Sequence, residues 1–281
     1  MIRRLPVLLL VGLLLIPAES GLAQDQRPDR RLRILVVNDD GYQAPGLLAL
    51  VDSLLPIADV SVAAPYEQQS GTGHGITYRD AIKVYEFGNP HGIVWYAVDA
   101  RPATVTRVAL VALLDSLPDL VVSGINTGDN VGTNAWVSGT AAAAREGALH
   151  GVPALAFSVN PTGSDAYQVA AGWARRIVQQ LLAEGALRAP LLLNVNLQGQ
   201  QPAGIRVTPM SLAVGEQRYD RRVSPRGQTY LWDDWSPPED DPVEGTDLFW
   251  FRRGYITITP LRIDQTDTAA IPMLERLFSR P

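Results

Sequence analysis

Apolar and polar segments alternate regularly along the chain from residue 32 onward. The run at 32–37 is short, β-branched and followed by polar residues, so it predicts a buried strand. Residues 45–55 carry leucine and valine at helical spacing, and a second apolar run at 59–64 stops at a proline. A strand, a helix and a strand in this order predict a βαβ unit of a parallel sheet.

The alternation continues toward the C-terminus. Further strands are expected at 81–87, 93–98, 119–123, 154–159 and 191–195, and further helices at 103–114, 140–149 and 166–182. This order predicts an α/β fold, a Rossmann-like three-layer sandwich with a mainly parallel sheet, within a domain spanning 32–281. From about residue 199 the composition shifts to Arg, Pro and Trp, with strands expected at 205–208, 228–232, 248–251 and 255–259. We interpret residues 199–262 as β-rich arms, suited to oligomer contacts.

The first 31 residues differ from the rest. Arg3 and Arg4 precede an apolar stretch at 5–16, and small residues up to Ala23 follow. This layout predicts a signal peptide over 1–23 and a polar linker over 24–31, and an apolar stretch this short does not span a bilayer comfortably. We therefore expect export to the periplasm or the exterior, without stable membrane insertion after cleavage. An uncleaved anchor or a misread start is the alternative.

Composition and charge exclude several classes of protein. With 281 residues and 46 % hydrophobic composition, the chain can bury a sizeable core. The formal net charge is −5 and no run of Lys or Arg follows the leader. The sequence therefore lacks the basic surface with which proteins bind duplex nucleic acid. The chain has no cysteine, so the core must hold the fold without disulfides.

Ligands of open α/β sheets bind beyond the carboxyl ends of the strands, so polar residues at these ends are the first candidates for a ligand site. Asn38, Asp39, Asp40 and Gly41 directly follow the first strand. Two adjacent carboxylates repel each other unless a cation or hydrogen-bond donors compensate, and oxygen ligands suit Mg²⁺ or Mn²⁺. An Asx-turn with its corner at Asp40 and Gly41 is the structural alternative.

Three further polar segments carry candidate ligands. The loop at 64–75 offers the Ser70 hydroxyl and glycines, including Gly71, that permit close approach of a ligand. In the loop at 123–130, the Asn126 amide could complete an oxygen-ligand shell and Asn130 could donate to a phosphate. Ser138, Gly139 and Thr140 open the helix at 140–149. Ser138 or Thr140 could serve only as an N-cap, or this helix end could bind an anion.

Taken in order, these segments resemble the SurE family, the survival-protein nucleotidases that hydrolyse 5′- and 3′-nucleoside monophosphates. The motifs are Asn-Asp-Asp-Gly-Tyr at 38–42, Ala-Pro at 64–65, Ser-Gly at 70–71, Ser-Gly-Ile-Asn at 123–126, Ser-Gly-Thr at 138–140, Asn-Val-Asn at 194–196 and Gly-Thr-Asp at 245–247. The resemblance covers about residues 33–266.

The resemblance implies a metal-dependent phosphomonoesterase. It implies Mg²⁺ or Mn²⁺ on Asp39, Asp40, Ser70 and Asn126, with Asp39 and Asp40 also catalytic, and a homodimer or homotetramer with exchanged arms. Together with the chemistry of the loops, it assigns phosphate contacts to Asn38, Gly71, Asn130, Ser138, Gly139 and Thr140. A water or an aspartyl nucleophile would each be consistent with this set.

Two departures from the family pattern bear on substrate preference. Thr104 stands where the family usually has Asp, and Val137 stands where Tyr is frequent. A broader acid phosphatase or exopolyphosphatase is the alternative enzyme, and a non-catalytic periplasmic binding protein is the alternative class. A dinucleotide enzyme is disfavoured because no Gly-x-Gly-x-x-Gly follows the first strand. An aromatic cluster could stack a base, or pack within the arms or at an oligomer interface: Tyr230, Trp232, Trp235 and Trp250.

Overall fold

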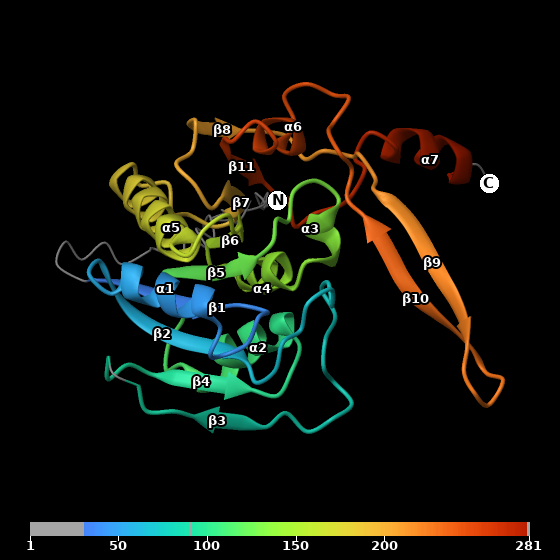
Figure 1. Cartoon of the computed structure of the whole chain (residues 1–281). Helices are drawn as coiled ribbons and strands as arrows, with labels where there is room; N and C mark the ends of the chain where they lie inside the picture. Colours follow the sequence, from blue (N-terminus) through green and yellow to red (C-terminus); the bar gives the residue numbers. More distant parts are fainter. Residues whose placement is uncertain (1–30, 90, 280–281) are drawn as a thin grey trace, which may run out of the picture. The chain divides into compact units, whose positions relative to one another are not determined.

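The computed structural model describes residues 31–89 and 91–279, which are built around one large β-sheet (Figure 1). Within these residues the sheet has nine strands in the order β3-β4-β2-β1-β5-β6-β7-β11-β8. Neighbouring strands are parallel except for β3 with β4 and β11 with β7. Their bounds are β1 Leu32–Val37, β2 Ala58–Pro65, β3 Val84–Glu86, β4 Trp95–Val98, β5 Leu120–Thr127, β6 Ala154–Asn160, β7 Leu192–Gln198, β8 Ile205–Val207 and β11 Ile256–Pro260. The predicted mainly parallel α/β sheet is confirmed.

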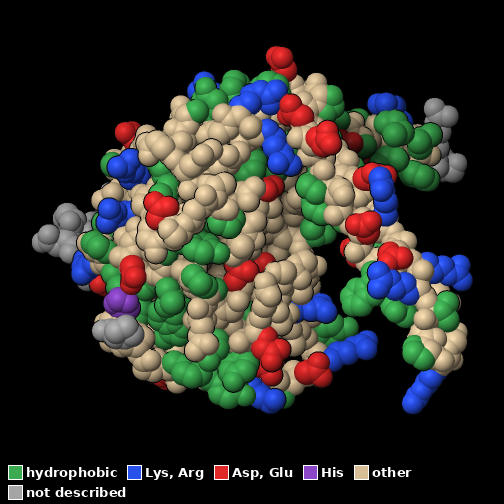
Figure 2. Space-filling model, in the orientation of Figure 1, with side chains coloured by type: hydrophobic (Ala, Val, Ile, Leu, Met, Phe, Trp, Pro, Cys, Tyr) green, Lys and Arg blue, Asp and Glu red, His purple; other side chains and the backbone are tan. Residues whose placement is uncertain are grey.

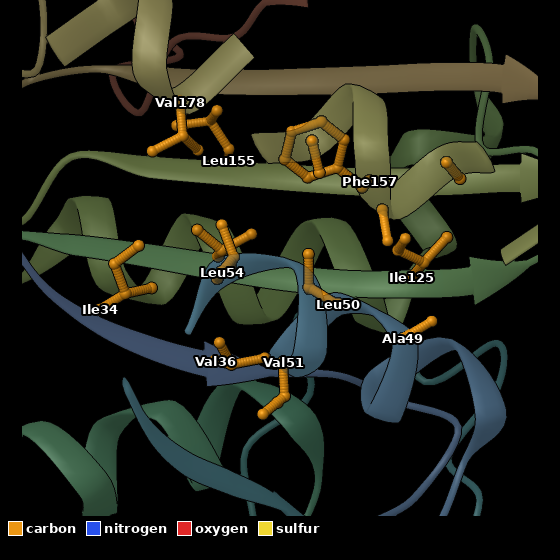
Figure 3. Packing of buried hydrophobic residues seen from close by; sticks show 14 of the residues in the cluster. Ile34, Val36, Ala49, Leu50, Val51, Leu54, Ile125, Leu155, Phe157 and Val178 are labelled. Atoms are coloured by element: carbon orange, nitrogen blue, oxygen red, sulfur yellow. The ribbon is translucent and has the colours of Figure 1, made fainter. Parts of the chain in front are cut away.

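Helices cover both faces of the sheet, which makes three layers. On one face, α1 (Pro45–Leu54) and α5 (Ala166–Ala183) enclose a core with Ile34 and Val36 of β1 (Figure 3). On the other face, α2 (Pro102–Val108), the π-helical turn η1 (Ala109–Leu113) and α4 (Gly139–Leu149) enclose a core with Leu35 and Val37. Successive residues of a strand point to opposite faces, so residues 34–37 of β1, which are buried on both faces, are all apolar. Burying each of these leucine, isoleucine and valine side chains contributes about 1.5–3 kcal/mol.

The chain crosses the centre of the sheet at β1, which lies between β2 and β5. Strands β2 and β4 follow on one side of β1, and the chain then returns to β5 on the other side. The crevice at such a reversal, beyond the carboxyl ends of the strands, is the usual ligand site of an open α/β sheet. Asp39 and Asp40 follow β1, and Asn126 lies near the end of β5.

Helix α4 approaches the sheet closely because its buried side chains are small. Ala141, Ala142, Ala143 and Ala144 are fully buried. A Cβ on Gly147 would lie 2.8 Å from Cγ2 of Val121 in β5, so a larger residue there would push the helix outward. This contact packs the last turn of α4 against the beginning of β5.

The C-terminal segment differs in part from the predicted arms. Strands β8 and β11 join the central sheet, while β9 (Glu216–Val223) and β10 (Thr229–Ser236) form a separate antiparallel hairpin, exposed along its whole length. Strand β9 was not predicted. Short helices that were not predicted occur as well, at α3 (Asn134–Val137) and α7 (Ile271–Phe278).

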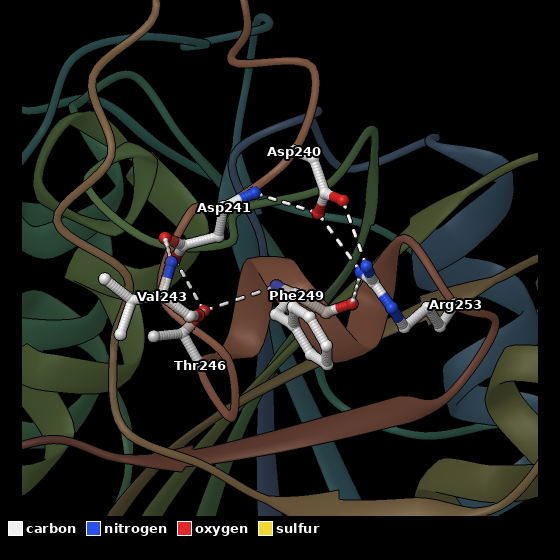
Figure 4. Close-up of polar contacts among 6 residues, drawn as sticks. All are labelled: Asp240, Asp241, Val243, Thr246, Phe249 and Arg253. Carbon is white, nitrogen blue, oxygen red and sulfur yellow. Dashed lines mark hydrogen bonds and ion pairs between the residues drawn. The ribbon is translucent and has the colours of Figure 1, made fainter.

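The strand expected at 248–251 is wrong, because these residues form helix α6 (Asp247–Phe251). Thr246 caps this helix by accepting a hydrogen bond from the Phe249 amide, and the Thr246 hydroxyl donates to Asp241 at 2.5 Å (Figure 4). Buried Asp247 accepts from the amides of Gly132 and Ser211, both at 2.8 Å. Capping and distant partners thus override the local strand preference of an aromatic run.

The predicted leader at 1–23 and most of the linker lie outside the described residues. Among the described residues, no helix has both the length and the apolar character required to cross a membrane.

Candidate active site

A polar cleft of about 640 Å³ lies beyond the carboxyl ends of the central strands. All four predicted polar segments contribute to it. They supply Asp39, Ser70, Gly71, Asn126, Asn130 and Ser138. Its size falls within the range of roughly 300–1,000 Å³ found for small-molecule sites.

Asp39 is a buried carboxylate at the floor of this cleft. Its side chain is 3 % exposed, and its Oδ1 accepts a 2.5 Å hydrogen bond from the Thr140 hydroxyl. Burial raises the pKa of Asp39 to about 7, the Thr140 hydrogen bond opposes this shift, and the neighbouring Asp40 charge adds to it. A Cβ on Gly139 would lie 2.8 Å from Asp39 Oδ2, so only glycine leaves this oxygen its space. Gly139 and Thr140 therefore contact Asp39 rather than line the cleft.

Asp40 lies beside the cleft rather than on its wall. Its Oδ2 accepts a 3.1 Å hydrogen bond from the Thr127 amide at the end of β5. Burial raises the pKa of Asp40, partly offset by hydrogen bonds from Thr127 and Gln68. Asn38, which is fully buried, donates from Nδ2 to the Gly41 carbonyl at 2.8 Å and so closes the turn. Both aspartates therefore keep carboxylate oxygens for a ligand, and the turn is closed by the Asn38 amide rather than by an Asx-turn at Asp40.

The segment that carries Ser70 is tied to the floor of the cleft. The Gln69 amide donates to the Asp39 carbonyl at 2.8 Å, and the Gln68 side chain donates to Ser70 Oγ at 3.2 Å. Gly71 has a positive φ of 72° and nothing within 4 Å of an added Cβ. Glycine meets this left-handed conformation without strain and leaves open space in the cleft.

Asn126 lies in β5 itself, which corrects the predicted loop at 123–130, because the strand continues to Thr127. The pairing of β5 with β6 is irregular between Ser123 and Asn126. A Cβ on Gly124 would lie 2.4 Å from the Phe157 carbonyl, so this irregularity requires glycine. The Asn126 Nδ2 donates to the carbonyls of Thr127 and Gly128 at 3.2 and 2.7 Å. This pair of bonds orients the amide and leaves its oxygen for a cation.

Asn130 is held by side chains whose roles were not predicted. Its backbone amide donates to Asn196 Oδ1 at 2.7 Å, and its backbone carbonyl accepts from Asn194 Nδ2 at 2.8 Å. The Asn130 side chain donates to Ser158 Oγ at 2.8 Å. The Asn-Val-Asn motif in β7 is recognisable in the sequence, but its role becomes visible only when β7 is placed beside this loop.

Ser138 has two functions at the start of α4. Its oxygen accepts a 3.0 Å hydrogen bond from the Ala141 amide, so the predicted N-cap is present. The oxygen accepts in that bond, so the hydroxyl proton remains free to be donated into the cleft, which Ser138 also lines. The first amides of an eleven-residue helix and its dipole favour an anion here.

The donor set fits a hard divalent cation. Asp39 and Asp40 are adjacent carboxylates, burial raises the pKa of both, and no ion pair links either to a basic residue among those described. The Asn126 amide oxygen and the Ser70 hydroxyl add neutral oxygen donors. Within the described part of the chain no group of three or more His, Cys, Asp or Glu residues is arranged to hold a metal ion, so the neutral oxygens of Ser70 and Asn126 are needed to complete this set.

The far wall of the cleft comes from the β9–β10 hairpin, through Gln217, Asp233 and Trp235. Of these, the sequence pointed only to Trp235, as a member of the aromatic cluster. Val137, one of the two departures, lines the cleft and is 57 % exposed. Thr104, the other position that departs from the family pattern, is buried away from the cleft and accepts a hydrogen bond from the Thr77 backbone amide at 2.8 Å.

Comparisons with known proteins agree on one family. The family profile described as "Survival protein SurE" matches residues 34–217. A 5′-nucleotidase SurE of Heliobacterium modesticaldum is 40 % identical over 245 residues, covering 85 % of this chain and 89 % of the relative. A 5′-nucleotidase SurE of Polaromonas sp. is 38 % identical over 260 residues, covering 89 % and 98 %. The crystal structure of a SurE protein from Aquifex aeolicus is similar with a TM-score of 0.75 and 32 % identity, covering 87 % of this chain and 99 % of that one.

Proposed function

Since the chain belongs to the survival-protein SurE family, we propose that it hydrolyses nucleoside 5′- and 3′-monophosphates to nucleoside and phosphate in the cleft at Asp39. It is a hydrolase of the 5′-nucleotidase class. The observation that carries the proposal is the buried Asp39 carboxylate, which faces a polar cleft beside the first turn of α4. Negative charge on this floor calls for a cation, and the helix end next to it favours a phosphate.

We assign Asp39, Asp40, Ser70 and Asn126 to a divalent cation, Mg²⁺ or Mn²⁺. Such a cation, when bound, neutralises phosphate charge and lowers the pKa of a coordinated water. The orientation of the Asn126 amide and the paired aspartates support this set.

The phosphate is assigned to the donors that line the same cleft beside Asp39. The Ser138 hydroxyl, the first amides of α4 and the Asn130 side chain supply donors, and Gly71 leaves room for the ester oxygens. Thr140 positions Asp39 through its hydrogen bond, and Gly139 keeps Asp39 Oδ2 accessible. Asn38 is buried beneath this region, so its contribution is to hold the turn that aims both aspartates.

Of the adjacent pair Asp39 and Asp40, Asp39 is the one that lines the cleft, so we assign it to orient or deprotonate the attacking water. The stereochemistry at phosphorus distinguishes this from an aspartyl-phosphate route. With a substrate that is isotopically chiral at phosphorus, inversion supports a single direct attack by water, whereas retention supports two displacements through a covalent intermediate on Asp39.

The assembly and the destination of the chain extend the proposal. Helix α7 has no buried residue, and its Leu274, Leu277 and Phe278 are 43–82 % exposed. A soluble chain covers such an apolar stripe, so we infer a homodimer or homotetramer in which a second copy does so. The leader at 1–23 supports export to the periplasm or the exterior. We expect the secreted protein to begin at Gln24 when its N-terminus is sequenced. A secreted protein that still carries residues 1–23 would contradict the predicted cleavage.

Phosphate release by the mature chain from Gln24 onward tests the function. The substrates are nucleoside monophosphates, p-nitrophenyl phosphate and short polyphosphate, with EDTA and then with Mg²⁺ or Mn²⁺ restored. Metal-restored release that is fastest on nucleotides supports the nucleotidase. Fastest release from polyphosphate or p-nitrophenyl phosphate would favour the broader phosphatase, and no release by the folded protein would favour the binding protein.

A further inference from the structure

We propose that Trp235 is a base-recognition residue: the nucleobase of the substrate stacks on its indole while the phosphate lies at Asp39. This inference rests on the proposed nucleotidase function and adds how the non-reacting end of the substrate is held. Three observations carry it, namely the face of the hairpin that Trp235 occupies, the way its ring is fixed, and the charge of its neighbours.

The register of the hairpin divides its residues between two faces. Trp235 pairs directly with Gln217, and Asp233 pairs with Tyr219. Directly paired residues, and every second residue along a strand, share a face, so Gln217, Asp233 and Trp235 lie together. These three are the hairpin residues that line the cleft. Figure 2 shows the hollow between the hairpin and the body of the domain.

The opposite face of the hairpin has a different character. It carries ion pairs along β9, between Arg218 and Glu216 and between Arg222 and Asp220. Trp232 also lies on that face, 60 % exposed, with its ring 6.4 Å from that of Tyr230. The aromatic cluster noted in the sequence is therefore split, with Trp235 on the cleft and Trp232 facing away.

The Trp235 ring is held against the base of the hairpin. A Cβ on Gly215 would lie 2.9 Å from Trp235 Nε1 and 3.1 Å from Cε2, so the indole edge occupies the space that glycine leaves. The side chain is still 42 % exposed. A fixed aromatic ring that remains accessible loses little conformational entropy when a flat base stacks on it.

The charges orient the substrate. The hairpin wall presents the Asp233 carboxylate, the Gln217 amide and an indole, none of which is a cation that would attract phosphate. The Gln217 side chain donates to Asp233, which links the two across the strands. The Ser138 hydroxyl and the first amides of α4 favour phosphate at their end of the cleft, whereas the hairpin offers neither a helix end nor a cation, which leaves the base for Trp235.

Substitution of Trp235 by Ala, assayed on AMP and on ribose 5-phosphate, tests the inference. Ribose 5-phosphate has the same ester but no base. We expect Trp235→Ala to lower kcat/KM for AMP roughly tenfold or more, since base stacking on an aromatic ring is typically worth that much, and to leave ribose 5-phosphate within about twofold. Trp235→Phe should restore part of the loss.

Trp232→Ala is the matched control, because it removes a tryptophan from the same strand on the opposite face. It should leave both substrates unchanged. Equal losses on both substrates for Trp235→Ala, particularly with a change in molecular mass by light scattering, would assign Trp235 to an interface and overturn the inference. If the wild type hydrolyses AMP and Trp235→Ala does so equally well, the inference is overturned but the proposed function stands. If the wild type does not hydrolyse AMP, both the inference and the proposed function are overturned.

Discussion

His74 Nε2 lies 2.8 Å from Oε2 of Glu146, a carboxylate that is only 1 % exposed on α4. Arg107 Nε donates to the other oxygen at 2.6 Å, and His150 Nε2 lies 3.1 Å from it. Burial alone would raise the pKa of Glu146, but the hydrogen bonds from His74 and Arg107 outweigh it and lower the pKa to about 2. The ionised carboxylate thereby ties the segment that carries Ser70 to the helix whose first turn borders the cleft.

Substitution of Glu146 by Gln should lower the stability of the chain. It removes a buried charge from hydrogen bonds to His74 and Arg107, and we expect a loss of about 1–3 kcal/mol at pH 7. The folded pKa lies below the ordinary value of 4.5, so this stabilisation is present above about pH 4.5 and is lost as pH falls toward 2. Urea unfolding at pH 7 and pH 3.5 checks this, because the difference from wild type should shrink at the lower pH. Glu67→Gln, an exposed change in the loop that carries His74, is the control and should be neutral.

Substitution of Gly139 by Ala should reduce turnover without unfolding the chain. The new methyl group would lie 2.7 Å from Asp39 Cβ and 2.8 Å from Oδ2, so the carboxylate must shift. A displacement of a catalytic group by about 1 Å can cost on the order of 100-fold in rate. Gly172→Ala, in the middle of α5 with nothing within 4 Å of the added Cβ, is the matched control. It should keep full activity and gain up to about 1 kcal/mol of stability. Unchanged turnover in Gly139→Ala would remove Asp39 from the reaction.

Cation binding should weaken below neutral pH. The pKa of Asp39 is raised to about 7, so below this pH a cation must displace the proton, and affinity falls up to about tenfold for each pH unit. Calorimetric titration with Mn²⁺ at pH 6 and pH 8 checks the expectation. Asp39→Asn should abolish both metal-dependent turnover and this pH dependence, while Asp80→Asn, an exposed change, should preserve both. Equal affinity at the two pH values would contradict the assignment of Asp39 as a ligand.

Removing the apolar stripe of α7 should change the assembly. We expect light scattering to give the mass of a dimer or tetramer for the wild type, and a smaller species for Leu274→Glu combined with Leu277→Glu. Arg276→Glu on the same helix is the control for added negative charge and should retain the wild-type mass. A wild type that is monomeric at micromolar concentration would exclude the interface.

The sequence by itself determined the sheet and the segments that build the site. A strand segment buried on both faces, such as residues 34–37 of β1, is apolar at every position and ends where polar residues begin, so its position is visible in the local pattern. Because the carboxyl ends of parallel strands meet at one edge, the order of strands and polar segments along the chain is enough to group Asp39, Ser70, Asn126 and Ser138.

Only the tertiary structure decided how distant segments complete that site. Asn126 lies in a strand because Gly124 permits an irregular pairing with β6, and residues 247–251 are helical because Asp247 finds partners far along the chain. Trp232 and Trp235 look alike in sequence, yet the strand pairing separates their faces and only one borders the cleft. Burial is encoded by the residue itself and its near neighbours, whereas a facing partner depends on where the chain returns in space, which local pattern does not specify.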